Sequence, residues 1–269
     1  MKLSYPIAAP DSRAQVQAFC GLYEPAFPWL REHGYTGVEL LVRDPAALSV
    51  ELLDRLLAEN GLRISAVGTS PMQVEDHLFL IHPEEENRRE AMRRCRDLVQ
   101  LASYYKAPAL VGKYRGQLCD RPGCGTGDMD QKFREICEYG RNWNTTILLE
   151  PQNSTNINNL NTIGETVAWL ERMGQPNLGI LADIYHMGVT EASIEDSLRM
   201  AAGRIGLIHM ADSGRMVPGL GELPIKSVLK TLEETAYHGF ISMEIRQWPD
   251  SFKASALSAL TMDYLARFN

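Results

Sequence analysis

The chain has 269 residues, of which 45% are hydrophobic and 23% are charged. This composition is ordinary for a globular protein and excludes a disordered chain, a collagen-like chain and a small disulfide-rich scaffold. The net charge of −7 disfavours nucleic-acid binding, because phosphate contacts need clustered Lys and Arg. We expect enough buried surface for one large core, and a single domain over residues 1–269.

No stretch of the sequence has the length and apolar character of a membrane span, and the N-terminal residues lack the apolar run of a signal peptide. The cysteines are odd in number and irregularly spaced, which is typical of a reduced, cytoplasmic protein. We therefore expect thiols, a cytoplasmic location and no membrane partner. The cysteines are Cys20, Cys95, Cys119, Cys124 and Cys137.

Short β-rich runs recur along the chain, and each is followed by a longer amphipathic stretch. Most of the runs are continuously apolar, as strands buried on both faces of a parallel sheet are. Helices are expected over residues 84–102, from an N-cap at Asp128, and from Ser251 towards Phe268. The eight predicted strands cover residues 3–5, 38–42, 64–67, 109–112, 146–150, 178–183, 205–210 and 240–245.

Eight strand–helix units in about 270 residues predict one (β/α)₈ TIM barrel, an α/β fold. A doubly wound open sheet is the alternative. That fold usually carries a Gly-rich turn after its first strand, and residues 7–11 contain no such turn.

Each of the last four predicted strands ends in a residue that does not belong in a core: Glu150, Asp183, His209 and Glu244. An isolated buried carboxylate costs several kcal/mol, and three carboxylates at one barrel mouth also repel one another. A divalent cation resolves both problems, whereas separate pairing with arginines or backbone amides is the alternative. Three carboxylates and an imidazole predict a site for Mn²⁺ first, and also suit Co²⁺, Mg²⁺ or Zn²⁺.

Several segments give the chain a resemblance to a known family. They read Leu-Leu-Glu-Pro at 148–151, Asp-Ile-Tyr-His at 183–186, His-Met-Ala-Asp-Ser-Gly-Arg at 209–215, Pro-Gly-Leu-Gly at 218–221 and Met-Glu at 243–244. Over essentially its whole length the chain resembles the xylose-isomerase-like barrel superfamily of sugar isomerases and epimerases, and within it the ketose 3-epimerases.

The resemblance implies an enzyme of carbohydrate metabolism, a metal-dependent isomerase or epimerase that acts on a ketose or related hydroxycarbonyl sugar, with or without a phosphate. It implies metal binding by Glu150, Asp183, His209 and Glu244. It further implies that Glu150 and Glu244 are the acid–base pair, and that His186 and Arg215 contact substrate oxygens. Barrels of this kind are commonly dimers or tetramers.

Proton transfer beside a carbonyl requires the groups that these residues supply. A metal ion polarises the carbonyl oxygen and stabilises the enediolate. Two carboxylates on opposite sides of the substrate can remove a proton from one face and return one to the other. Return to the opposite face of the same carbon gives epimerisation, and return to the neighbouring carbon gives isomerisation. The sequence leaves both outcomes open.

Basic residues near the predicted mouth are candidates for binding an anion. Arg246 lies two residues after Glu244, so it is expected on the same face of the strand, where it could bind a phosphate or carboxylate tail. A structural salt bridge is an equal alternative. Lys113 and Arg115 form a weaker candidate for an anion site.

The chain departs from the ketose 3-epimerases at one position. Those enzymes carry another Glu six residues after the first metal-binding Glu, and this chain has Asn156 there, so the identity of the substrate stays open.

Three other functions are alternatives to an isomerase or epimerase. An inosose-type dehydratase would use the same single-metal site to eliminate water. A non-catalytic, metal-stabilised barrel would only bind a sugar or a partner. An AP-endonuclease-like nuclease would need more metal ligands at the ends of strands two to four, where this chain offers Thr69, Ser70, Lys113 and Tyr114. We therefore expect a small-molecule sugar partner and no nucleic acid.

Overall fold

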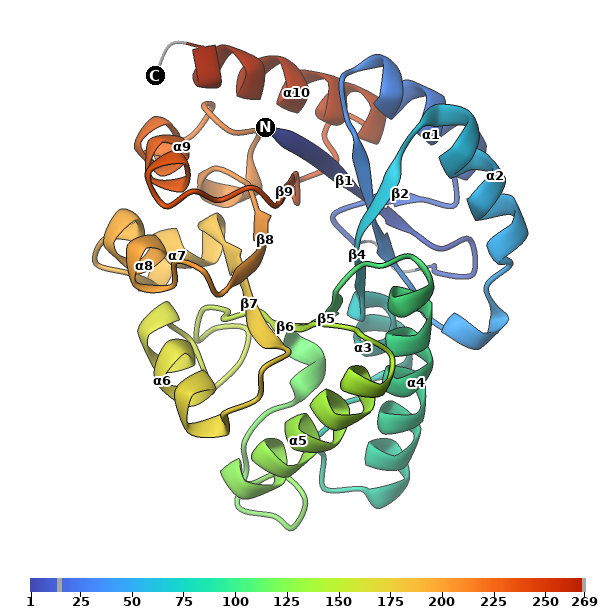
Figure 1. The fold of residues 1–269 in the computed structure, drawn as a ribbon, viewed down its shortest axis with the longest axis vertical. Coiled ribbons are helices and arrows are strands. Elements are labelled where there is room, and N and C mark those ends of the chain that lie inside the picture. The colour runs from blue at the N-terminus through green and yellow to red at the C-terminus, as the bar shows by residue number, and fades with distance from the viewer. Residues whose placement is uncertain (14–15, 268–269) are drawn as a thin grey trace.

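The computed structural model describes residues 1–13 and 16–267 of the chain. Figure 1 shows strands at the centre of the molecule and helices arranged around them. The strands are parallel and pair in the order β2-β1-β3-β4-β5-β6-β7-β8-β9, and β1 also pairs with β9 through Leu3 and Ile241. This last pairing closes the sheet, so the chain forms the predicted (β/α)₈ barrel.

Eight strands form the wall of the barrel, and all eight were predicted. A further strand of two residues, β2 (Phe19–Cys20), pairs with Ile7 and Ala8 at the end of the first strand and was not predicted. The wall strands are β1 (Lys2–Ala8), β3 (Gly37–Leu41), β4 (Arg63–Gly68), β5 (Ala109–Val111), β6 (Ile147–Leu149), β7 (Leu178–Asp183), β8 (Ile205–His209) and β9 (Phe240–Ser242).

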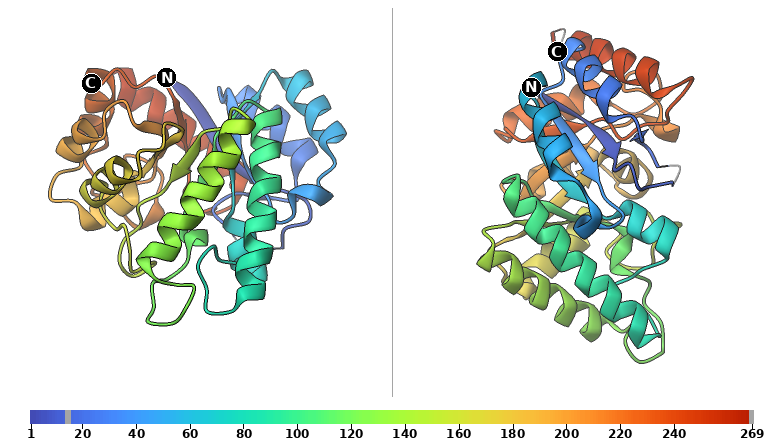
Figure 2. Two further views of the ribbon diagram at one scale, coloured as in Figure 1. Left: turned by 60° about the horizontal axis from the view of Figure 1, so that its bottom comes forward. Right: turned by 90° about the vertical axis from the view of Figure 1, so that its right-hand side faces the viewer.

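Helices cover the outside of the wall, and at least one follows each wall strand. Figure 2 shows the two long helices α4 and α5 side by side, and they are in contact. The helices are α1 (Tyr23–Glu32), α2 (Val50–Asn60), α3 (Ser70–Asp76), α4 (Glu85–Tyr104), α5 (Thr126–Asn142), α6 (Ile163–Met173), α7 (Ile184–Thr190), α8 (Ile194–Met200), α9 (Ile225–Glu234) and α10 (Ser251–Arg267).

Side chains along each wall strand alternate between two cores. Those that point outward, such as Ile180 and Ile208, belong to the large apolar cluster beneath the helices. Those that point inward, such as Leu148 and Leu181, form a small cluster inside the barrel. Leu148 lies over Gly206, where a Cβ atom would come within 2.7 Å of its Cδ2 atom. This part of the interior is therefore filled by side chains.

Several predicted boundaries were wrong. The strand predicted over 146–150 ends at Leu149, and the one predicted over 240–245 ends at Ser242. Glu150 and Glu244 therefore lie in the loops that follow these strands. Asp128 is not an N-cap, because α5 begins at Thr126 and Asp128 instead accepts a hydrogen bond from the Gly125 amide at 2.9 Å. The predicted end of α10 at Phe268 lies outside the described residues.

Cys119 and Cys124 form a disulfide, so the predicted reduced state is wrong for this pair. The loop after β5 folds back so that the Cys119 amide donates to the Cys124 carbonyl at 3.0 Å, which places the two side chains together. Cys95 and Cys137 are buried thiols. None of the helices in the described part of the chain has both the length and the apolar character needed to cross a lipid bilayer. The cytoplasmic location stays a prediction.

We expect Leu148→Ala to lower the free energy of unfolding by about 2–5 kcal/mol, because the barrel interior cannot collapse around the lost side chain. Denaturant unfolding followed by circular dichroism measures the change. Leu260 is 66% exposed on α10, so Leu260→Ala serves as the control and should cost less than about 0.5 kcal/mol. Equal costs for the two variants would contradict the packing described above.

Candidate active site

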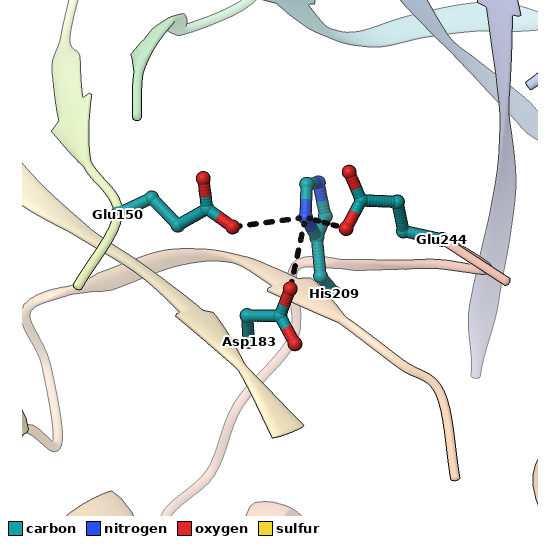
Figure 3. A group of neighbouring side chains, drawn as sticks. All are labelled: Glu150, Asp183, His209 and Glu244. Atoms are coloured by element: carbon teal, nitrogen blue, oxygen red, sulfur yellow. Dashed lines mark ion pairs between the residues drawn. The ribbon is translucent and has the colours of Figure 1, made fainter. Parts of the chain in front are cut away.

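The four residues singled out at the strand ends meet at one end of the barrel. Asp183 and His209 are the last residues of β7 and β8, whereas Glu150 and Glu244 follow β6 and β9 by one and two residues. Each of the four residues lies two positions after a residue that faces the barrel interior, or just beyond the end of its strand. Its side chain therefore points into the open end of the barrel. Figure 3 shows Glu150 and Glu244 approaching the imidazole from opposite sides, with Asp183 below.

One ligand atom from each residue points towards a common centre, and all four atoms lie within 4.8 Å of one another. His209 Nδ1 is 3.7 Å from Glu150 Oε1, 3.7 Å from Asp183 Oδ2 and 3.3 Å from Glu244 Oε2. These same four atoms are buried, and among the described residues they have no partner beyond one another and, for Asp183 Oδ2 and Glu244 Oε2, ion pairs with Arg215. Three carboxylates thus share one guanidinium, and a bound divalent cation would compensate the remaining charge, so the residues fit a metal ion.

The remaining atoms of Asp183 and His209 hold these side chains in place. Asp183 Oδ1 accepts hydrogen bonds from the amides of Tyr185 at 2.9 Å and His186 at 3.2 Å, and so caps α7. His209 Nε2 lies 2.9 Å from Glu39 Oε2 of β3. Because the carboxylate only accepts, Nε2 carries the proton and the Nδ1 lone pair is directed at the centre.

Glu150 is held by its neighbours in the loop after β6. The Gln152 side-chain amide donates to Glu150 Oε2 at 2.5 Å, so Oε1 is the oxygen that faces the centre. Gly112 at the end of β5 leaves space for this carboxylate, because a Cβ atom there would collide with Glu150 Oε2. The Arg115 guanidinium donates to the Glu150 carbonyl at 2.9 Å.

Arg115 does not form the anion site that was one candidate from the sequence. Its side chain is fully buried and also donates to Asn159 Oδ1 at 2.8 Å and to the Asn159 carbonyl at 2.9 Å. Burial lowers the pKa of Arg115 to about 10, against the opposing effect of Glu150. The guanidinium thus fixes the loops after β5 and β6 and has no face left for a substrate.

Arg215 enters the site from the loop after β8. Its Nη1 atom lies 2.7 Å from Asp183 Oδ2 and 2.6 Å from Glu244 Oε2, and its guanidinium packs over the Tyr185 ring at 4.5 Å. Asp212 holds this loop, because its carboxylate accepts the amide hydrogens of Ser213, Gly219 and Leu223 at 2.7–2.8 Å. The loop therefore presents Arg215 in a fixed orientation.

His186 lies beside Arg215, as the sequence predicted for two substrate contacts. It is 2% exposed, and its Nε2 atom is 3.1 Å from Arg215 Nη2. Its Nδ1 atom is 2.8 Å from Asn153 Nδ2, and Asn153 Oδ1 in turn accepts the Thr155 amide at 3.1 Å. Both side chains border the same pocket as Glu150, His209 and Glu244.

The charges of the site shift its protonation equilibria. Burial raises the pKa of Asp183, but the Arg215 guanidinium beside it is the main opposing influence and the pKa lies well below its usual range. Glu244 shifts in the same direction, with Arg215 and His209 outweighing burial. Burial lowers the pKa of His209, but Glu39 and Glu244 raise it well above normal. A proton and a metal ion thus compete for His209 Nδ1.

A pocket of about 410 Å³ opens over the four residues, within the usual range for small-molecule sites. Lys113 and Arg246 both line it. Arg246 was expected on the same strand face as Glu244, but β9 has already ended, and the Arg246 amide instead donates to the Arg215 carbonyl at 2.8 Å. Neutral side chains, including Gln152 and Asn156, complete the wall.

Comparison with known proteins agrees with this geometry. The family described as a xylose isomerase-like TIM barrel matches residues 27–261, most of the chain. The chain belongs to this family. The resemblance drawn from the strand-end motifs is therefore confirmed.

Several proteins similar to this chain are named as sugar epimerases. The ketose 3-epimerase of Arthrobacter globiformis is 26% identical over 219 residues, which are 80% of this chain and 74% of that protein. The 3-dehydro-D-guloside 4-epimerase of Escherichia coli K12 is 23% identical over 235 residues, 82% of this chain and 86% of that protein. A solved structure of an L-ribulose 3-epimerase has a TM-score of 0.80 at 19% identity and covers 100% of this chain and 95% of its own. The chain is accordingly an enzyme.

A nuclease of the AP-endonuclease type would need additional metal ligands. In residues 1–13 and 16–267, the cluster of Glu150, Asp183, His209 and Glu244 is the one group of His, Cys, Asp and Glu side chains with convergent ligand atoms. A solved structure named as an AP endonuclease of family 2 from Brucella melitensis has a lower TM-score, 0.67, at 18% identity. Nothing in the geometry indicates a nucleic-acid substrate.

The sequence analysis missed the residues that hold the predicted ones. Glu39 and Asp212 contact site residues and were not assigned to the site, and the contacts of Gln152 with Glu150 and of Asn153 with His186 were not predicted either. Glu39 could have been found, because it is a carboxylate inside a predicted apolar strand. The other three lie in loops, where a polar residue is ordinary and gives little signal.

We expect Glu39→Gln to weaken Mn²⁺ binding by about 10–100-fold, since the neutral amide no longer orients and polarises His209. Titration calorimetry measures the affinity. Glu171→Gln makes the same chemical change on an exposed side chain that pairs with Arg204 far from the mouth, and it should bind Mn²⁺ normally. Equal affinities of the two variants would show that Glu39 does not support the imidazole.

Proposed function

We propose that the protein is a divalent-metal-dependent epimerase or isomerase of a ketose or related hydroxycarbonyl sugar. One observation carries the proposal: three carboxylates and an imidazole direct buried atoms, whose charge Arg215 offsets only in part, at one point below a pocket of monosaccharide dimensions. The family membership and the sugar-epimerase relatives support it. A sugar is the expected small-molecule partner, and a dimer or tetramer stays a prediction.

Glu150, Asp183, His209 and Glu244 would hold the ion, and Mn²⁺ suits this ligand set best, with Co²⁺, Mg²⁺ and Zn²⁺ compatible. When bound, the ion supplies Lewis-acid polarisation of the substrate carbonyl and charge that stabilises the anion developing beside it. Its charge also offsets the repulsion among the three carboxylates.

Glu150 and Glu244 are proposed as the acid–base pair. They project from opposite sides of the site, so one can remove a proton from the substrate carbon while the other returns one to the opposite face (Figure 3). Gln152 fixes Glu150 through Oε2, which restricts the carboxylate to one orientation. A base of fixed orientation reaches the reacting hydrogen without a search over rotamers.

His186 and Arg215 are proposed to bind substrate oxygens. Both are oriented by other residues, His186 by Asn153 and Arg215 by the loop that Asp212 holds. The guanidinium and imidazole lie 3.1 Å apart and border the pocket, so they can contact neighbouring hydroxyl or carbonyl oxygens. Arg246 is proposed as a further substrate contact at the rim.

We expect the Mn²⁺-loaded or Co²⁺-loaded protein to exchange a carbon-bound hydrogen of a ketose with D₂O, and a chelator to stop the exchange. Glu150→Gln and Glu244→Gln should each lower the exchange rate by at least about 10²-fold, because each removes a proton carrier. Nuclear magnetic resonance of the sugar measures the exchange, and calorimetry checks that each variant still binds the metal.

Glu222→Gln provides the matched control, because Glu222 is an exposed carboxylate in the loop after β8 that does not line the pocket. This variant should exchange at the normal rate. Exchange that survives either Glu150→Gln or Glu244→Gln would exclude the two-carboxylate mechanism.

We expect Gly112→Ala to reduce kcat by about 10-fold or more in protein that still folds and binds Mn²⁺. The added methyl group displaces the Glu150 carboxylate, and a small misplacement of a catalytic group is costly. Gly112 has φ −96° and ψ −120°, outside the regions that alanine prefers, so circular dichroism and titration calorimetry check that the variant folds and binds Mn²⁺. Unchanged kcat would mean that the position of Glu150 does not matter.

A further inference from the structure

The rim of the pocket carries two cations that have no anionic partner. Lys113 is the first residue of the turn after β5, and Arg246 follows β9. Both line the pocket, yet among the described residues neither side chain makes an ion pair or hydrogen bond. Arg215, in the same pocket, pairs with both Asp183 and Glu244. The two rim cations therefore stay available to a ligand.

The acids of the pocket cannot neutralise these cations. Three carboxylates line the pocket, and each of them already has a partner at the bottom of the pocket. Glu39 pairs with His209, Glu150 accepts from Gln152 and faces the ligand centre, and Glu244 meets Arg215. The other polar residues near the rim are neutral, and they are Gln17, Thr69, Ser70, Gln73, Gln152 and Asn156. The pocket thus presents two cations, Lys113 and Arg246, that no carboxylate of its lining neutralises.

The two cations stand on opposite walls of the mouth. In the closed order of the sheet, three wall strands separate β5 from β9 in either direction. Each cation also rests on a fixed backbone. Arg246 is tied to the Arg215 carbonyl at 2.8 Å. The residues after Lys113 are anchored, because the Tyr114 hydroxyl donates to the Ala91 carbonyl at 2.7 Å.

We propose that the substrate is an anionic sugar, with a carboxylate or phosphate at the end remote from the reacting carbonyl. Arg246 binds this group through its guanidinium, which matches both anions in bidentate fashion, and Lys113 attracts it from the facing wall. The inference rests on the proposed function, because the carbonyl end of the same molecule must lie at the four ligand residues. The inference narrows the proposed substrate class from ketoses in general to sugar acids or sugar phosphates.

Three ketoses that differ only at carbon six test the proposal: D-fructose, D-fructuronate and D-fructose 6-phosphate. Calorimetry with the Mn²⁺-loaded protein gives binding, and D₂O exchange gives kcat/KM. At least one of the two anions should bind about tenfold or more tightly than fructose, as a charge-assisted contact predicts. The preference should shrink at high salt. The anion that binds more tightly identifies the group at the remote end of the substrate as a carboxylate or a phosphate.

Arg246→Met and Lys113→Met remove each charge while keeping most of the side-chain length. The anion-to-fructose ratio of affinities should fall to near one in Arg246→Met and fall partly in Lys113→Met. Arg63→Met is the matched control, because Arg63 is an exposed arginine at the start of β4, on the opposite end of the barrel. It should keep the full ratio.

Binding and exchange together separate this inference from the proposed function. Equal binding of all three sugars, binding of none, or a preference that survives Arg246→Met would overturn the anionic substrate. Exchange of fructose without an anion preference would leave the proposed function standing and remove only the inference. A clear anion preference without exchange of any sugar would support the binding site and count against the epimerase.

Discussion

The repulsion among three buried carboxylates is the constraint on which the rest of the site depends. Glu150, Asp183 and Glu244 direct oxygens at one centre, where no backbone amide of the described residues compensates their charge. Such an arrangement is stable only with positive charge beside it. Arg215 supplies part of that charge from one side, and the ligand set suits a divalent cation for the remainder.

In each supported side chain, one polar atom makes the supporting contact and a second polar atom is left to face the centre. Asp183 caps α7 with one oxygen, His209 uses Nε2 on Glu39, and Glu150 gives Oε2 to Gln152, so in each case the other atom faces the centre. The barrel assists through its register. Pairing shifts at Val38/Glu39 and at Ile180/Leu181, just before Glu39 and Asp183, and such irregularities re-aim the side chains that follow.

The charged residues that line the pocket above this centre differ between its bottom and its rim. Carboxylates dominate at the base, the Arg215–His186 pair lies beside them, and the rim carries Lys113 and Arg246 among neutral amides and hydroxyls. In TIM barrels the catalytic residues lie at the C-terminal ends of the strands, whereas the loops at the mouth select the molecule that reaches them. Specificity in this protein is therefore to be sought in the loops after β5 and β9.

The sequence by itself determined the barrel and the four residues at its mouth. Continuous apolar runs at regular spacing allow few other folds, and a charged residue directly after such a run is improbable unless it has a function. Tertiary structure decided what distant loops contribute. Glu39 meets His209 across the barrel, Arg115 turns inward instead of towards a substrate, and Cys119 pairs with Cys124. These contacts join residues through loop conformations, and no periodicity in the sequence records where a loop places its side chains.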